Sequence, residues 1–239
     1  AANAPRLSPA PVCVVAAARR ALGARRSSSG ILAGRVGAGT APPRPRGAGG
    51  RGLAGDGDRP TLLVTLAALS PALLFQPVTL ATSTLSRNAA SVTARFKTTS
   101  YADGIAAARE ARAAGAEEAL LLTTAGRVAC ATIANIFVVK GDRLITPSLD
   151  QAIIAGTMRQ MILNVAGLLN YQVEERAVEL SELHEADQVF LTNSLRFIRP
   201  VTHLDGRSLG RADLTRLEAA LCRFAERQCG LDPRRLGAS

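Results

Sequence analysis

The stretch "EALLLTTAGRVACATIANIFVVKGDRLITP", residues 118–147, decides the fold class. Its aliphatic and β-branched residues come in short blocks, which are separated by AG and KGD. Such blocks favour strands, and glycine commonly marks the turns between them. We therefore predict strands at 118–124, 127–139 and 143–147, with turns around Gly126 and at 140–142.

The segments around this stretch alternate between strand and helix patterns. Apolar residues at helical spacing mark 156–169 as an amphipathic helix, and an alanine-rich helix at 101–115 is closed by Gly115. Strands in adjacent pairs with helices between them predict a mixed α+β domain at 60–239 rather than a doubly wound sheet. The other predicted elements are strands at 61–69, 77–85, 171–178 and 187–195, a short helix at 180–186, and a last helix marked by Leu214, Leu217, Leu221 and Phe224.

Residues 1–59 differ in composition from the rest of the chain. Up to residue 60 the sequence holds 11 of the 21 glycines and 7 of the 12 prolines, a density that does not sustain a helix or a strand ladder. We predict a poorly structured segment there, with one short helix at 12–24. Its abundance of Arg, Ala and Ser is typical of an organellar transit peptide. We predict a cytoplasmic location, with an organellar location as the alternative if residues 1–59 are such a peptide.

The net charge of +10 is concentrated in the same segment. Residues 1–60 carry ten arginines and two aspartates, a charge of +8, whereas the rest of the chain carries +2. No aromatic residue accompanies those arginines, which excludes the stacking pattern of nucleic-acid-binding proteins. No apolar run reaches the roughly 18–20 residues of a membrane span. We predict no nucleic-acid partner, no membrane partner and, because the four cysteines and two histidines lack zinc-ligand spacing, no metal site.

Lys97, in TARFKTTSY, is one of only two lysines among 29 basic residues. The other, Lys140, lies in the KGD turn, where a solvated amine is expected. Lys97 is predicted to follow a strand and to precede directly a helix whose first turn is 98–100. The positive end of a helix dipole lowers the pKa of an amine, and a neutral amine is the form that attacks a carbonyl group. Lys97 is therefore a candidate nucleophile, with an ordinary surface lysine as the alternative.

Two other places are candidates for binding an anion. Gly156 and Thr157 open the predicted amphipathic helix, where free backbone N–H groups can bind a phosphate. The segment LTNSL ends a strand with small polar side chains, among them Asn193 and Ser194. An ordinary helix start and a strand-end turn are the alternatives. A phosphate-bearing aldehyde cofactor would unite both places with Lys97.

Residues 94–163, which include FKTTSY, GRVACATIANIF and AGTMRQ, together with LTNSLRFIRPVTHLDGRSLG, resemble the class IV pyridoxal-phosphate-dependent aminotransferase family. Within the family the likeness is greatest to the 4-amino-4-deoxychorismate lyases. The resemblance implies the second domain of the D-amino-acid aminotransferase-like fold, a barrel-like mixed β-sheet flanked by helices. It also implies pyridoxal 5'-phosphate as the cofactor, a homodimer as the assembly, and residues 1–59 as the remnant of a first domain.

The resemblance assigns roles to individual residues. Lys97 would form the covalent bond to the cofactor and would move protons during the reaction. The phosphate would be bound by Gly156 and Thr157 with Asn193 or Ser194, the ring would lie beside Asn135, and Arg196 would bind a substrate carboxylate or remain a solvated arginine.

Cys130 departs from the family's pattern, which reads GRVxExxxxNxF and places a glutamate at this position. The glutamate pairs with the pyridine nitrogen and keeps it protonated, which makes the ring a strong electron sink. A thiol, with an unperturbed pKa of about 8.5, would do so poorly. We therefore place Cys130 in the cofactor site and expect transamination to be weakened.

The implied function is a lyase that converts 4-amino-4-deoxychorismate to 4-aminobenzoate and pyruvate, a step in the synthesis of a folate precursor. A branched-chain or D-amino-acid aminotransferase is the first alternative. A non-catalytic member of the family is the second, because of Cys130 and because the phosphate-binding arginine of a first domain is not identified within 1–59.

Overall fold

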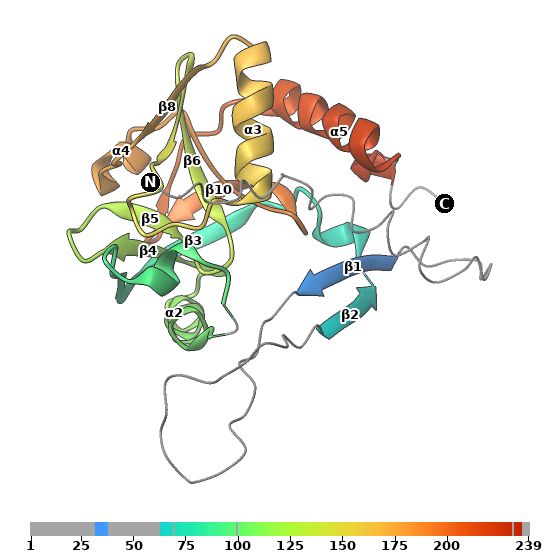
Figure 1. The fold of residues 1–239 in the computed structure, drawn as a ribbon. Coiled ribbons are helices and arrows are strands. Elements are labelled where there is room, and N and C mark those ends of the chain that lie inside the picture. The colour runs from blue at the N-terminus through green and yellow to red at the C-terminus, as the bar shows by residue number, and fades with distance from the viewer. Residues whose placement is uncertain (1–31, 38–62, 69, 99, 231, 236–239) are drawn as a thin grey trace, which may run out of the picture. The chain divides into compact units, whose positions relative to one another are not determined.

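The computed structural model describes residues 32–37, 63–68, 70–98, 100–230 and 232–235 (Figure 1). They belong to two compact units, of which one contains β1 (Leu32–Gly37) and β2 (Leu63–Ala68) and the other begins at Ser70. In the first unit, β1 and β2 pair antiparallel. The strand predicted at 61–69 is thus confirmed, whereas the sequence analysis did not predict β1. The helix predicted at 12–24 lies outside the described residues.

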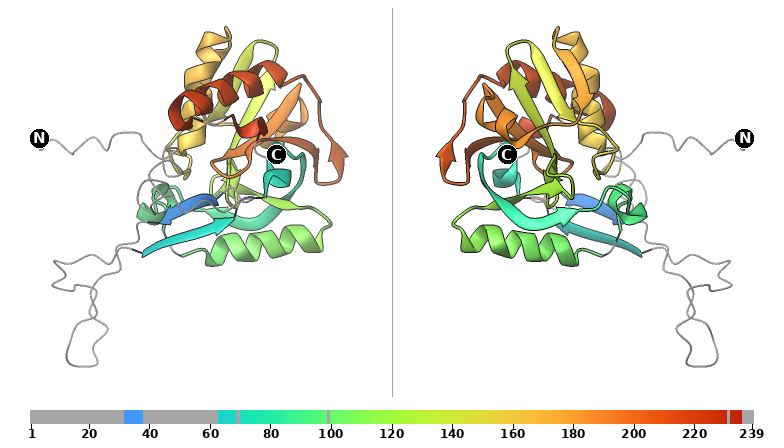
Figure 2. Two further views of the ribbon diagram at one scale, coloured as in Figure 1. Left: turned by 90° about the vertical axis from the view of Figure 1, so that its right-hand side faces the viewer. Right: turned by 90° about the vertical axis from the view of Figure 1, so that its left-hand side faces the viewer.

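Nine strands of the second unit form one sheet: β3 (Val78–Arg87), β4 (Glu118–Thr123), β5 (Val128–Ala131), β6 (Asn135–Lys140), β7 (Arg143–Pro147), β8 (Gln172–Arg176), β9 (Gln188–Asn193), β10 (Phe197–Leu204) and β11 (Arg207–Ser208). Their order is β5-β4-β3-β10-β9-β6-β7-β8, with β11 beside β10. β3 pairs parallel with β4 and β10, β7 pairs parallel with β8, and the other pairs are antiparallel. This curled, mixed sheet confirms the predicted fold class (Figure 2).

Helices cover the sheet at two places. α2 (Ala102–Ala113) packs against β3 and β4, while α3 (Thr157–Leu168) packs against β8, β9 and α5 (Thr215–Cys229). Figures 1 and 2 show α2 at one end of the sheet and α3 with α5 at the other. α2 and α3 confirm the helices predicted at 101–115 and 156–169. Gly115, just after α2, has a φ of 79°, which glycine adopts without the strain of a Cβ.

Two apolar clusters stabilise this unit. Side chains alternate between the faces of a strand, so each strand contributes every second residue to one cluster. The larger cluster occupies one face of the sheet and includes Val78, Leu80, Ile136, Val138, Val189 and Leu191. The smaller cluster lies where α2 meets β3, β4 and β5, and it includes Ala81, Ala107, Ala111, Leu121, Cys130 and Ile153.

The structure corrects one prediction on the sheet and adds one strand. Residues 127–139, predicted as one strand, form β5 and β6 with a break at 132–134. At this break the N–H and Oγ1 of Thr132 donate hydrogen bonds to the buried Glu118 carboxylate, and the N–H of Ala131 donates to the carbonyl of Ala134 at 2.9 Å. The sequence analysis assigned no element to the segment directly after residue 195, which forms β10 between β3 and β9 at the centre of the sheet.

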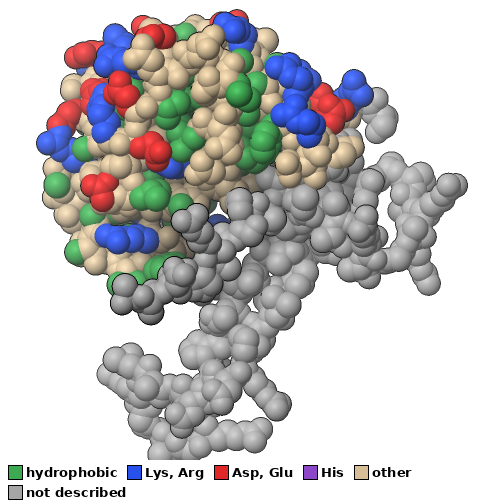
Figure 3. All heavy atoms as spheres, turned by 45° about the horizontal axis from the view of Figure 1, so that its top comes forward, with side chains coloured by type: hydrophobic (Ala, Val, Ile, Leu, Met, Phe, Trp, Pro, Cys, Tyr) green, Lys and Arg blue, Asp and Glu red, His purple; other side chains and the backbone are tan. Residues whose placement is uncertain are grey.

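The surface carries charges of both signs. In the view of Figure 3, Lys and Arg side chains lie beside Asp and Glu side chains on the described face. Among the residues with a described structure, no helix is both long enough and apolar enough to cross a bilayer. The same residues contain no group of three or more His, Cys, Asp or Glu side chains placed to hold a metal ion.

Candidate active site

Lys97 lies on an exposed segment between the short helix η2 (Val92–Arg95) and α2. Its Nζ donates a hydrogen bond of 2.7 Å to Tyr101 Oη and lies 5.5 Å from the centroid of that ring. Two predictions about its setting are wrong. The residue follows η2 rather than a strand, and α2 begins only at Ala102, so the residues directly after Lys97 are not its first turn.

Arg87, at the end of β3, connects the Lys97 segment to the chain that leads into α3. Its Nε donates to the carbonyl of Ala152 at 2.6 Å, and its Nη2 donates to the carbonyl of Ala94 at 2.9 Å. Ala152 has a φ of 57°, a conformation that a non-glycine residue adopts only when neighbours hold it. Arg87 is thus a positioning residue that the sequence analysis missed, because its two partners are far apart in the sequence.

Asn135 and Gly156 are in direct contact. Asn135 is buried at the start of β6, and its Nδ2 donates to the carbonyl of Ile154 at 2.9 Å. A Cβ on Gly156 would lie 2.1 Å from Asn135 Oδ1, far inside the van der Waals limit. Any larger residue at position 156 would therefore displace the Asn135 side chain or the helix start, and the Asn135 amide holds the chain that leads into α3.

The first turn of α3 presents backbone N–H donors that have no partner within the described part of the chain. Gly156 is its N-cap, and no side chain caps the helix. The first helical bond runs from the N–H of Gln160 to the carbonyl of Gly156 at 3.0 Å, so the N–H groups of Thr157 and Met158 precede the helical ladder. Gly156 and Thr157 are both partly exposed. Donors of this kind, at the positive end of a helix, suit an anion.

The turn between β9 and β10 is built by Asn193. Its Oδ1 accepts hydrogen bonds from the N–H groups of Leu195 at 3.0 Å and Arg196 at 2.9 Å, and its Nδ2 donates to the carbonyl of Ile133 at 3.3 Å. The side chain of Asn193 therefore positions the turn and joins it to the break before β6. Ser194 is exposed and Arg196 is partly buried.

Cys130 is buried within the smaller apolar cluster. Burial raises the pKa of its thiol to about 11, an effect that the charge of Arg87 opposes and that of Glu118 reinforces. The side chain is therefore an uncharged thiol at neutral pH. Position 130 supplies no negative charge to a neighbouring group.

Two buried polar side chains near α3 were not singled out in the sequence. Arg159, in the first turn of α3, pairs with Glu175 at 2.6 Å, yet its Nε has no hydrogen-bond partner among the described residues. The Oγ1 of Thr192 likewise has none, and Thr192 pairs with Asn135 across β6 and β9. No sequence signal distinguishes either residue, because burial and partners depend on strands distant in the chain.

Some of the predicted site residues are in direct contact, and others are connected only through hydrogen bonds of intervening residues. Asn135 and Gly156 touch, Thr157 follows directly, and Asn193 bonds to the break that precedes β6. Lys97 is linked to this group through the bonds of Arg87. Two surface hollows of about 470 and 360 Å³ have other linings, one beside His203 and Asp205 and one beside Arg211 and Glu218. Neither hollow is lined by a candidate site residue.

Comparison with known families gives a match over most of the chain. The profile of the family described as amino-transferase class IV matches residues 44–204. Among curated proteins, the probable branched-chain-amino-acid aminotransferase of Aquifex aeolicus is 35% identical over 136 residues, which cover 56% of this chain and 44% of that protein. The chain thus spans less than half the length of this relative.

Solved structures share the fold. A structure from Legionella pneumophila, provisionally named a 4-amino-4-deoxychorismate lyase, has a TM-score of 0.68 at 29% identity, covering 76% of this chain and 66% of that one. A branched-chain aminotransferase from the archaeon Thermoproteus uzoniensis, solved with norvaline, has a TM-score of 0.64 at 28% identity, covering 70% and 56%. These likenesses confirm the predicted fold.

Proposed function

This chain belongs to the class IV aminotransferase family, and from that premise we propose that it is a pyridoxal-phosphate-dependent lyase. Class IV aminotransferases use pyridoxal 5'-phosphate. The proposed substrate is 4-amino-4-deoxychorismate, and the proposed products, 4-aminobenzoate and pyruvate, together contain all of its atoms. Residues 60–239 are the proposed cofactor-binding domain.

The residues present fit the phosphate and the aldehyde of this cofactor. The free N–H groups at the start of α3 suit the phosphate, with Gly156 and Thr157 as the proposed ligands and Ser194 as an additional hydroxyl. The exposed amine of Lys97 suits covalent attachment. When bound, the cofactor would supply an electron-withdrawing ring that favours loss of a proton from the substrate carbon that carries the amino group.

The chain's own residues divide the remaining work. Lys97 would accept that proton once its amine is released by the substrate, and the hydroxyl of Tyr101, 2.7 Å from Nζ, would orient the amine. Asn135 would act on the phosphate indirectly, by holding the chain before Gly156 through the Ile154 carbonyl. Arg196 is the proposed partner of a substrate carboxylate.

The buried thiol of Cys130 is the observation that favours a lyase over an aminotransferase. With its pKa raised to about 11 by burial, Cys130 supplies no carboxylate-like charge at the proposed ring position. Amino-group transfer depends strongly on a protonated ring. An elimination that makes its product aromatic has a larger driving force of its own and tolerates the weaker electron sink better.

An aminotransferase is the second candidate, because the curated relatives carry branched-chain aminotransferase names. A non-catalytic family member is the third, since the same Cys130 weakens both reactions. We also propose a homodimer and a cytoplasmic location, with an organellar one if residues 1–59 act as a transit segment. Sedimentation and imaging of tagged protein test these two proposals.

Product analysis separates the three candidates. The purified protein, supplied with pyridoxal 5'-phosphate, is given 4-amino-4-deoxychorismate, and separately a branched-chain amino acid with 2-oxoglutarate. The proposal expects 4-aminobenzoate and pyruvate in equal amounts and little glutamate. Glutamate without 4-aminobenzoate would establish the aminotransferase, and the absence of all products would favour the non-catalytic candidate.

A substitution at position 130 tests the reasoning on the ring partner. Cys130→Glu is expected to raise amino-group transfer relative to 4-aminobenzoate release, since a carboxylate replaces the thiol. Cys130→Gln is the matched control, because glutamine has the shape of glutamate without its charge. Cys222→Glu would be unsuitable, because it would place a charge in a different buried site. An unchanged ratio of the two reactions in Cys130→Glu would contradict the placement of Cys130.

A further inference from the structure

Arg159 is buried more deeply than its charge would lead one to expect. Its side chain is 3% exposed in the first turn of α3. Nη2 donates to the carbonyl of Pro147 at 3.0 Å and to Glu175 Oε2 at 2.6 Å, while Nε has no partner among the described residues. Glu175, its counter-ion on β8, is 46% exposed and therefore screened by water.

This placement carries three energetic costs. A cation in the first turn meets the positive end of the helix dipole, and the first turn of α3 has no acidic residue to offset it. A buried N–H without a partner loses its hydrogen bonds to water. A buried charge with a single, half-exposed counter-ion is incompletely compensated. The start of α3 therefore carries an excess of positive charge.

An anion at the start of α3 would offset this positive charge. Such an anion would meet the N–H groups of Thr157 and Met158, and the charge of Arg159, which lies in the same turn, would add to their potential. Arg159 also ties this turn to the end of β7 through the Pro147 carbonyl, so it fixes where those N–H groups point.

We propose that Arg159 is a positioning residue that turns the start of α3 into a charged anion site by adding positive potential and by holding the turn against β7 and β8. The anion in question is the phosphate of the cofactor, so this inference rests on the proposed function. It adds to that function a residue that does not touch the phosphate, and it links anion binding to the stability of the fold.

The role predicts opposite effects on stability and on binding. In Arg159→Met, a side chain of similar length loses the charge, and Glu175 can remain solvated. Without an anion this variant should unfold at the same temperature as the wild type or a higher one. Its affinity for inorganic phosphate and for pyridoxal 5'-phosphate should fall about tenfold, the size expected for one nearby charge. The affinity of the wild type for inorganic phosphate should also fall with added salt, because salt screens the charges.

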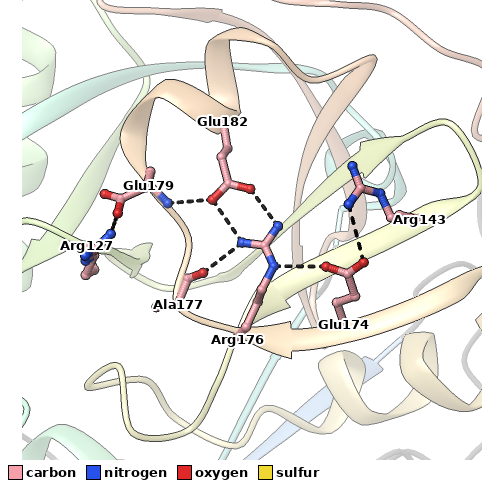
Figure 4. A network of polar contacts seen from close by, with 7 residues as sticks. All are labelled: Arg127, Arg143, Glu174, Arg176, Ala177, Glu179 and Glu182. Atoms are coloured by element: carbon pink, nitrogen blue, oxygen red, sulfur yellow. Dashed lines mark hydrogen bonds and ion pairs between the residues drawn. The ribbon is translucent and has the colours of Figure 1, made fainter.

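Three further variants separate charge from mere packing. Arg159→Lys keeps the charge and should retain most of the phosphate affinity. Glu175→Gln removes the counter-ion, so it should bind phosphate more tightly while being less stable without it. Arg143→Met is the matched control: it removes an arginine that pairs with β8 through Glu174 at 3.6 Å, within the contacts of Figure 4, and should leave phosphate affinity unchanged.

Thermal unfolding and titration calorimetry with inorganic phosphate and with pyridoxal 5'-phosphate decide the matter. If Arg159→Met loses stability and binds both anions as tightly as the wild type, the residue is only a brace and the proposal is overturned. If Arg159→Met does not fold, Glu175→Gln decides, and unchanged phosphate affinity there overturns the proposal. The wild type could fail to bind pyridoxal 5'-phosphate while inorganic phosphate still raises its unfolding temperature more than that of Arg159→Met. In that case the proposed function fails and the role of Arg159 stands.

Discussion

Arg176 and Arg159 lie in neighbouring elements, but their guanidinium groups differ in burial and in how many hydrogen-bond partners they have. Arg176, on β8, has a partner for every guanidinium nitrogen: Glu174 for Nε at 2.9 Å, and Glu182 for Nη1 at 2.9 Å and Nη2 at 2.6 Å (Figure 4). These hydrogen bonds, that of Glu182 first, raise the pKa of Arg176 above its ordinary value. Arg159 is far more buried and has one carboxylate and an unpartnered Nε.

The contrast separates a charge that builds structure from one that serves a ligand. Glu182 also accepts the N–H of Glu179 at 2.9 Å within the capping box of α4 (Leu180–His184), so the Arg176 network fixes the start of that helix. Nothing comparable among the described residues completes the partners of Arg159. We therefore expect changes at the start of α3 to affect anion binding first, and changes around Arg176 to affect stability alone.

Of the substitutions considered, Gly156→Ala should disrupt the start of α3 most severely. The new Cβ would lie 2.1 Å from Asn135 Oδ1, so either Asn135 or the helix start must move. We expect phosphate affinity to fall by more than about tenfold and the free energy of unfolding to fall by about 2–3 kcal/mol. Calorimetry and urea unfolding measure the two effects.

Gly167→Ala is the matched control within the same helix. Gly167 has open space where its Cβ would lie, and alanine favours a helix over glycine, so this variant should be as stable as the wild type or more stable. Equal behaviour of the two alanine variants would contradict the packing described for Gly156.

Arg176→Met should disrupt the hydrogen-bond network around Arg176 and leave the start of α3 unchanged. Losing the paired hydrogen bonds to Glu182 and Glu174 should lower the free energy of unfolding by about 1–2 kcal/mol, a moderate value because the side chain is 37% exposed. Phosphate affinity should stay within about twofold of the wild type, because the start of α3 is untouched. A loss of phosphate affinity as large as that of Arg159→Met would remove the distinction between the two arginines.

Cys130 sharpens the contrast with an effect confined to alkaline pH, because burial keeps this side chain an uncharged thiol at neutral pH. The unfolded chain releases the thiol proton near the ordinary pKa of 9.0, whereas the folded protein keeps it up to about 11. The contribution of Cys130 to the free energy of unfolding should therefore be constant below pH 9 and fall by about 2 kcal/mol as the pH rises to 11.

Urea unfolding at about pH 8 and about pH 10.5, on either side of the ordinary thiol pKa, measures this fall. Cys130→Ala should show a shallower fall than the wild type, and Cys222, whose pKa is also raised to about 11 by burial, accounts for what remains. An unchanged pH dependence in Cys130→Ala would show that its thiol ionises as readily in the folded protein as in the unfolded chain.

Much of the sheet could be predicted because its strands are bounded by local signals. Gly126 and the turn at 140–142 mark strand ends directly, and the structure places strand boundaries there. The break at 132–134 was missed because Thr132, Ile133 and Ala134 include no glycine or proline to mark it, and Thr132 bonds there to Glu118, which lies 14 residues away. β10 was not predicted, because a proline such as Pro200 disfavours a central strand, yet the segment pairs with β3 and β9.

The candidate site was less predictable from the sequence. Gly156 and Thr157 were identified because a helix start has a local signal. Arg87 and Arg159 were not, because what distinguishes them is the set of carbonyls and carboxylates that other strands bring to them. The setting of Lys97 was mispredicted by a few residues, since the segment 98–101 has helix-compatible residues that lie before α2.

The most direct test of the account is the site of covalent attachment of pyridoxal 5'-phosphate. The protein is incubated with the cofactor, reduced with borohydride, digested, and analysed by mass spectrometry, with Lys97→Ala and Lys140→Ala as a matched pair. Lys140 is exposed at the end of β6 and bonds to the carbonyl of Glu185, so it reports random labelling of a surface amine. We predict a label at Lys97 in the wild type and in Lys140→Ala, and its loss in Lys97→Ala. Equal labelling of both lysines, or none at Lys97, would contradict the assignment of Lys97 as the cofactor-binding lysine.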